Sequence, residues 1–330
     1  MPSPVDLVLA SVFAVLVLIG VVGNVLVCLV ILRFSSMRTP MNYLLLNLAA
    51  ADLLTLLFVS PQYVFIHTFV HPIGRAGDII CKLLTGGNIS WIGGVASVFA
   101  LVSIAFERYY AVIHPQSQGR ISKRSLWITV VSCWLFSLLF NAPLFYVIHY
   151  DSEMKFCMES WPNAVLAQIN STCWFVMIGL IPVTIMVGLY SKVIYSLWIK
   201  KEESADNTQL GTKRVRKKVT KTVLTVSIIY TLCWFPQLSI YMLSYVGSDN
   251  EFGGVSYIIT VALVTVNSVV NPIIYSLQSG KFRKCLKVVL CRNQRRVEDS
   301  GVRGPGDVAA AGGNSKATPS RANMCQYELK

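Results

Sequence analysis

Asp52 is the one carboxylate that stands inside a long apolar stretch of this chain. Amide and hydroxyl side chains interrupt the other apolar stretches at Asn24, Ser97, Asn267, Ser268 and Asn271. An ionisable group at such a depth needs polar partners, and oxygen ligands around one carboxylate suit a small hard cation or a proton. The alternative interpretation is a structural hydrogen-bond network around a neutral Asp52.

Two prolines lie beside large aromatic residues within apolar stretches. Pro236 ends a Cys-Trp-Phe-Pro sequence that contains Trp234, and Pro272 stands in Asn-Pro-Ile-Ile-Tyr between Asn271 and Tyr275. Proline removes a backbone hydrogen bond and kinks a helix. These positions predict hinges, at which a small shift near a ligand moves the far end of the helix.

The elements that must hold these residues are predicted from composition and length. Hydrophobic residues make up 54% of the 330 residues and charged residues 14%, whereas a soluble domain is about a quarter charged. Seven apolar stretches each exceed the roughly 20 residues that cross about 30 Å of hydrocarbon as a helix. They cover residues 7–32, 41–66, 83–106, 125–148, 164–191, 222–248 and 252–280. We therefore expect an all-α membrane protein with a seven-transmembrane helix bundle over residues 7–280.

The basic residues predict how the bundle is oriented. Only Arg75, Lys82 and Lys155 lie on the side of the amino terminus, and the other side holds the remaining 26 of the 29 basic residues. Positive charge marks the cytoplasmic side. The chain should therefore have an extracellular amino tail at 1–6, a membrane-parallel amphipathic helix at 281–292 and a disordered cytoplasmic tail at 293–330. Basic residues beside a membrane indicate a lipid partner, and we expect no nucleic acid.

This orientation sorts the cysteines and the modification sites. Cys81 and Cys157 are the two that lie clearly outside, where thiols oxidise, so we expect one disulfide between them. Asn170 is the one extracellular glycosylation sequon. Cys285 and Cys291 follow the basic amphipathic segment and are candidates for palmitoylation.

Seven motifs, one for each apolar stretch, resemble the rhodopsin-like G-protein-coupled receptors over residues 7–292. They include the Asn24, Asp52 and Trp134 positions, Glu107-Arg108-Tyr109, Pro182 with Tyr190, and the two proline motifs described above. The resemblance implies a receptor at the plasma membrane that catalyses exchange on a heterotrimeric G protein. It implies no bond chemistry, so the chain should not be an enzyme, and arrestin and a receptor kinase are possible further partners.

The resemblance also implies roles for individual residues. Trp234 would sense the ligand at the pocket floor, and Pro236 would be the hinge for outward movement of the inner half of its helix. Arg108 would then reach Tyr190 and Tyr275 and face the G protein. The set around Asp52 matches the family's sodium pocket, which implies Na⁺ as an allosteric ion and no other cofactor.

Three departures from the family pattern bear on the structure, beside Tyr230, which stands where the family commonly has phenylalanine. The inner end of the sixth stretch is basic, so no acid there can pair with Arg108. Between Cys81 and Arg108 the sequence is two residues longer than usual and contains Gly86 and Gly87, which predicts a bulge. The usual Trp-x-Phe-Gly of the first outer loop is replaced by the sequence that starts at His71.

Two ligand classes conflict with the residues present. A retinal receptor needs a lysine in the seventh stretch, and an amine receptor needs a carboxylate in the outer third stretch; residues 252–280 and 83–106 contain neither. The Cys-x-Glu-x-Trp-Pro sequence from Cys157 resembles neuropeptide receptors of the neuropeptide Y, galanin and RFamide group. Such receptors carry a hairpin in this loop, which leaves the mouth open to a peptide end.

An acidic outer rim suits a basic or amidated peptide. The candidates for ligand contact, by chemistry and helix level, are Gln62, Ser90, Trp91, Glu159, Trp174, Gln237, Tyr241 and Tyr257. The alternatives are a class A receptor for a lipid or another small non-amine ligand, a receptor with constitutive activity alone, and a cation transporter or channel. A single intramembrane acid and the absence of a sequence repeat speak against the last of these.

Overall fold

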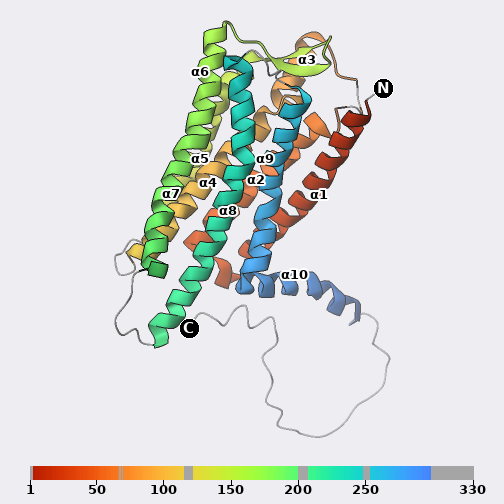
Figure 1. Ribbon diagram of the computed structural model, residues 1–330. Helices are drawn as coiled ribbons and strands as arrows, with labels where there is room; N and C mark the ends of the chain where they lie inside the picture. Colours follow the sequence, from red (N-terminus) through yellow and green to blue (C-terminus); the bar gives the residue numbers. More distant parts are fainter. Residues whose placement is uncertain are drawn as a thin grey trace, which may run out of the picture.

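The computed structural model describes residues 3–66, 68, 70–114, 122–199, 207–247 and 253–298. Within them, seven helical segments are long and apolar enough to cross a membrane, which confirms the predicted bundle (Figure 1). Five consist of one helix each: α1 (Pro4–Arg33), α2 (Pro40–Tyr63), α5 (Lys123–Val147), α8 (Asn207–Val246) and α9 (Val255–Gln278). A short 3₁₀ turn, η1 (Ser35–Met37), joins α1 to α2.

The remaining two spans are composite. The third consists of α3 (Gly74–Ile80), the π-helical turn η2 (Cys81–Thr85) and α4 (Asn88–Ile113). The fifth consists of α6 (Ala164–Trp174), η3 (Phe175–Leu180), α7 (Ile181–Ile194) and η4 (Tyr195–Ile199), of which η3 and η4 are also π-helical. Gly87 between η2 and α4 has φ 77°, a left-handed conformation that glycine adopts without strain. The predicted bulge is therefore present.

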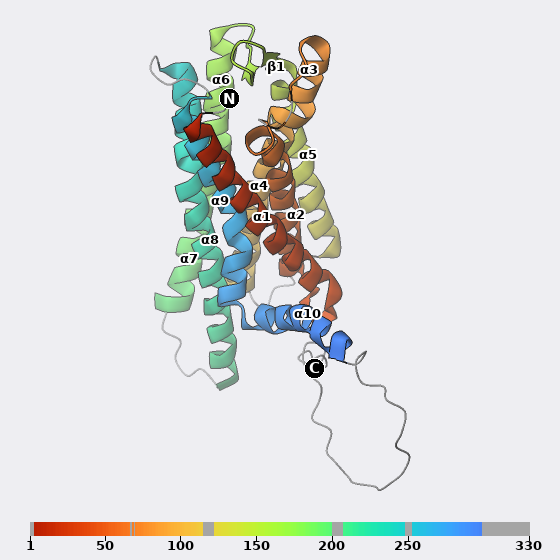
Figure 2. The ribbon, with the colours of Figure 1, turned by 90° about the vertical axis from the view of Figure 1, so that its right-hand side faces the viewer.

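The two ends of the bundle differ. At one end, β1 (Ile148–Asp151) and β2 (Phe156–Glu159) form an antiparallel hairpin with Tyr150 opposite Cys157, as expected from the family resemblance. We call this the hairpin end. At the other end, α10 (Gly280–Glu298) lies across the bundle, and we call it the α10 end (Figures 1 and 2).

Two boundaries differ from the predictions. α1 begins at Pro4, because Ser3 and Asp6 form a capping box that satisfies the first backbone donors, so most of the predicted tail 1–6 is helical. α10 ends at Glu298 rather than at residue 292. The predicted disordered tail lies outside the described residues from 299 onward.

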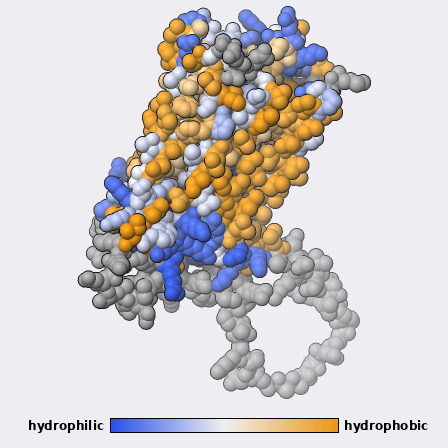
Figure 3. Space-filling view, in the orientation of Figure 1, coloured by the Kyte–Doolittle hydropathy of each residue, from blue (hydrophilic) through white to orange (hydrophobic). Residues whose placement is uncertain are grey.

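Packing within the bundle is tight, and its outer face is apolar. A Cβ on Gly93 would lie 2.7 Å from the Ala51 carbonyl oxygen, so α4 meets the backbone of α2 directly. Trp134 donates a hydrogen bond of 2.9 Å to Asn47 and joins α5 to α2. Figure 3 shows apolar side chains spread over the outward face that includes α1, where Leu18 is 66% exposed. A surface of this kind suits contact with lipid.

Candidate functional site

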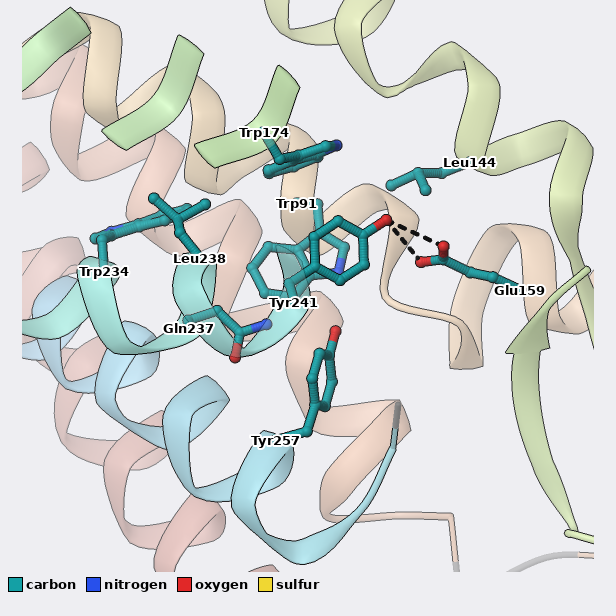
Figure 4. A pocket seen from close by; sticks show the side chains of 9 residues that line it. All are labelled: Trp91, Leu144, Glu159, Trp174, Trp234, Gln237, Leu238, Tyr241 and Tyr257. Carbon is teal, nitrogen blue, oxygen red and sulfur yellow. Dashed lines mark hydrogen bonds between the residues drawn. The ribbon is translucent and has the colours of Figure 1, made fainter. Parts of the chain in front are cut away.

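A pocket lies beneath the hairpin (Figure 4). Nine side chains line it: Trp91, Leu144, Glu159, Trp174, Trp234, Gln237, Leu238, Tyr241 and Tyr257. They come from α4, α5, α6, α8, α9 and β2. Six of the eight predicted ligand residues therefore lie together, above Trp234, which was predicted as the pocket floor. Leu144 and Leu238 were missed, because a leucine in an apolar helix gives no sequence signal that separates pocket from core.

Glu159 is the charged group of this pocket. Its Oε2 accepts hydrogen bonds from Trp161 Nε1 at 2.8 Å, from the Tyr245 hydroxyl at 2.9 Å and from the Tyr241 hydroxyl at 3.0 Å. Its Oε1 accepts one longer bond of 3.2 Å from the same Tyr241 hydroxyl, so this oxygen keeps capacity for another donor. Among the described residues, no lysine, arginine or histidine forms an ion pair with it.

The electrostatics of Glu159 follow from this setting. Burial raises the pKa of its carboxyl, and the hydrogen bonds from Trp161, Tyr245 and Tyr241 act in the opposite direction. A carboxylate that is partly removed from water and has no cation beside it is costly unless hydrogen-bond donors surround it. The pocket therefore holds a fixed acceptor that a cationic group would stabilise further.

An aromatic column connects the mouth of the pocket to its floor. The ring centroid of Trp174 lies 6.3 Å from that of Tyr241 and 5.8 Å from that of Trp91, and Trp91 lies 6.2 Å from Trp234. The indole nitrogens of Trp174 and Trp234 are buried and have no hydrogen-bond partner among the described residues. The column thus ends beside Pro236, which lies within α8.

Two predicted ligand residues lie elsewhere. Ser90 Oγ donates to the Thr55 carbonyl at 3.1 Å, so this side chain faces α2 rather than the pocket. Gln62 is buried beside Gly87, where its amide oxygen would meet an added Cβ at 2.5 Å. Because α4 restarts after the left-handed Gly87, the register of its first turn places Trp91 in the pocket instead of Ser90.

The polar residues around Asp52 form a buried network. Ser97 Oγ donates to Asp52 Oδ1 at 3.0 Å, and Asn271 Nδ2 donates to Asp52 Oδ2 at 2.7 Å. Asn24 Nδ2 donates at 2.9 Å to the Ser268 carbonyl, which lacks its helical donor because proline occupies position 272.

This network fits a small cation. Asn267 is 2% exposed, and its amide oxygen has no hydrogen-bond partner among the described residues. One carboxylate together with amide and hydroxyl oxygens is the ligand set of a hard monovalent ion, with Asp52 as the charged ligand.

The switch residues at the α10 end are only partly brought together. Arg108 pairs with its neighbour Glu107, and Tyr190 shares a 3.2 Å hydrogen bond with Ser227 on α8. Tyr275 is 6% exposed, and no hydrogen bond among the described residues joins it to Arg108 or Tyr190. The expected meeting of Arg108, Tyr190 and Tyr275 belongs to the activated receptor and stays a prediction. The Tyr109 ring lies 5.9 Å from Lys192 Nζ, which adds a cation–π contact from α7.

The covalent predictions have different outcomes. The disulfide between Cys81 and Cys157 is confirmed, and it joins η2 to β2. Glycosylation of Asn170 conflicts with the geometry, because its Nδ2 points inward and donates to the Tyr241 hydroxyl at 3.0 Å. Palmitoylation of Cys285 conflicts with its burial at 0% exposure. The Cys291 side chain lies outside the described residues and stays a prediction.

Comparison with known proteins identifies the family of this fold. Residues 23–275 match the family described as 7 transmembrane receptor (rhodopsin family). The chain is 30% identical to galanin receptor 2a of Danio rerio, over 88% of this chain and 80% of that protein. It is 27% identical to the pyroglutamylated RF-amide peptide receptor of Rattus norvegicus, over 100% of this chain and 80% of that protein. It is 29% identical to neuropeptide FF receptor 2 of Rattus norvegicus, over 89% of this chain and 75% of that protein.

The family match covers most of the chain, and the seven membrane-spanning helices agree with a seven-transmembrane receptor. The protein belongs to the rhodopsin family of seven-transmembrane receptors. It is a multi-pass membrane protein and a receptor rather than an enzyme.

Proposed function

We propose that the receptor binds an extracellular peptide with a basic or amidated end and activates a heterotrimeric G protein. The observation that carries this is Glu159, a half-buried carboxylate at the pocket mouth that accepts hydrogen bonds from three side chains and forms no ion pair with a described residue. The names of the galanin, RF-amide and neuropeptide FF receptors support a peptide ligand. The aromatic walls suit the apolar part of such a ligand, and the unpaired indole N–H groups suit its carbonyls.

The proposal includes an orientation. The hairpin end with its disulfide faces the outside of the plasma membrane, and the basic α10 end faces the cytoplasm. The ligand would press on the aromatic column, and α8 would turn at Pro236 so that its inner half opens a site for the G protein beside Arg108. Arrestin and a receptor kinase would act at the same end.

The first experiment measures calcium flux in cells that express the receptor with a promiscuous G-protein α subunit. We expect a submicromolar response to one or more amidated basic peptides. The same peptides with citrulline in place of arginine should lose potency, because citrulline keeps the shape and removes the charge. A silent peptide panel, with surface expression verified and a lipid library active, would instead assign a lipid ligand.

We also infer that Na⁺ binds at Asp52 and favours the inactive conformation. Raising Na⁺ in place of an organic cation should lower agonist affinity by about tenfold, within the usual range of allosteric coupling. Asp52→Asn and Ser97→Ala should abolish this dependence. Ser137→Ala removes an equally buried hydroxyl that bonds only the Cys133 carbonyl, and it should leave the dependence intact. Equal sodium effects in all four proteins would refute the site.

A further inference from the structure

A second hollow lies on the outside of the bundle, away from the ligand pocket. It lies between α1, α9 and α10. Its wall residues are Leu18, Ile19, Val22, Gly23, Leu26, Val269, Pro272, Ile273, Ser276, Leu277, Phe282 and Leu286. Figure 2 shows the lower ends of α1 and α9 near α10, which contributes Phe282 and Leu286 to the wall. We call this hollow the α1–α9 groove.

The groove has the chemistry of a site for hydrocarbon. Ser276 is the one wall residue with a polar side chain. Leu18 and Leu277, on opposite walls, are 66% and 68% exposed, so the opening faces outward at the depth of the membrane. An extended acyl chain can fill such a groove, whereas water cannot make hydrogen bonds along it.

Positive charge borders the lower end of the groove. α10 carries Arg283 and Lys287, both exposed and one helical turn apart. Each follows directly after a wall residue, Phe282 or Leu286, so the cations lie about 100° around the helix from the groove wall. From Gly280 to Leu290 the helix contains no acidic residue.

The position of α10 is fixed relative to the groove. Lys281 Nζ donates a 2.9 Å hydrogen bond to the Ser36 carbonyl in η1, and Phe282 is 4% exposed. The apolar wall and the adjacent cations therefore keep a fixed arrangement, with the apolar wall at the depth of the lipid tails and the cations at the depth of the headgroups. This is the layout of a phospholipid.

We propose that the α1–α9 groove binds an anionic phospholipid, with one acyl chain in the groove and the phosphate group at Arg283 and Lys287. A zwitterionic lipid would fill the groove but gain little from the two cations. A sterol would lack the anionic group. A second copy of the chain is disfavoured, because a two-fold contact across this face would bring the same basic residues of both copies together.

The test uses the full chain in nanodiscs that contain phosphatidylcholine and a minor fraction of phosphatidylserine. After mild detergent extraction, native mass spectrometry counts the lipids that stay bound. We expect phosphatidylserine to be enriched over its share of the disc. The double variant Arg283→Gln/Lys287→Gln should reduce this enrichment by about 30-fold, since each cation near the surface contributes independently.

A matched variant controls for general loss of charge. Lys123→Gln/Arg124→Gln removes two exposed basic residues at the same end of the bundle, from α5, which does not border the groove. It should retain the wild-type enrichment. Equal loss in both double variants, or no enrichment in the wild type, would overturn the proposal.

A second pair of variants tests the groove itself. Val22→Trp places a large ring in the groove from an outward position, and Leu139→Trp places the same ring on the outer face of α5, where Leu139 is 66% exposed. We expect Val22→Trp to release the bound lipid and Leu139→Trp to keep it. Retention in both, or cross-linked dimers through Val22→Cys, would refute an acyl chain at this position. None of these measurements uses an agonist, so their results are independent of whether the ligand is a peptide.

Discussion

Replacing Glu159 with glutamine is expected to lower the potency of a cationic peptide agonist by about 100-fold, because removing one partner of a buried charge pair costs roughly 2–5 kcal/mol. The glutamine has nearly the same shape, and its carbonyl oxygen can still accept two of the three hydrogen bonds that Trp161 and the two tyrosines donate. The loss would therefore measure the charge rather than the packing. Radioligand binding and calcium flux should show the same shift.

A matched variant separates this effect from the general field of the hairpin. Glu153→Gln removes an acid from the turn of the same hairpin, where it is exposed. We expect a change of less than threefold, because exposed charges are screened by salt. Similar losses in both variants would mean that long-range attraction, and not a pairing at Glu159, attracts the ligand.

The same residue should make binding depend on pH. Burial raises the pKa of the Glu159 carboxyl, so protonation begins at a higher pH than for an exposed glutamate. The neutral form cannot pair with a cation, and potency should therefore fall as the pH is lowered. Glu159→Gln should remove this dependence, and an unchanged pH profile would exclude Glu159 as its source.

The double variant Cys81→Ser/Cys157→Ser should have the largest effect on stability. The disulfide closes a separation of 76 residues, for which the chain-entropy model gives about 4.5 kcal/mol. The hairpin that carries Glu159 would also lose its tie to η2. We expect a lower Tm of the purified receptor, reduced surface expression and loss of peptide binding in the molecules that reach the surface.

Cys173→Ser is the control for this experiment. Cys173 is exposed on α6 and takes no part in the disulfide. It should unfold at the wild-type Tm. A double variant with wild-type Tm would show that packing of the hairpin alone holds it in place.

The bundle could be predicted from sequence because the membrane imposes one strong requirement, a run of apolar residues of fixed length. The helix ends were less predictable, since the helical backbone continues where the apolar run stops. α8 begins at Asn207, well before the apolar stretch that starts at 222, and α1 begins at a cap that hydropathy does not register.

The pocket residues could be predicted from sequence only as far as the directions of their side chains could be. Trp91, Tyr241 and Glu159 were predicted from their chemistry and level, but Ser90 was misplaced because the sequence reveals the glycines of the bulge without the rotation that they introduce. The sequence at Asn170 likewise matches a glycosylation sequon, but it does not show that the Asn170 amide points toward the Tyr241 hydroxyl.

The hydrogen bonds from Tyr241 and Tyr245 couple the two ends of the receptor. Both tyrosines lie on α8 between Pro236 and the hairpin end, and both hold a carboxylate that belongs to β2. A turn of α8 at Pro236 therefore changes how firmly the hairpin closes over the pocket. By thermodynamic reciprocity, a partner that binds only when the α10 end of α8 is displaced outward also changes the affinity for the ligand. The affinity of the ligand, measured with and without the bound partner, is the quantity that this linkage would set.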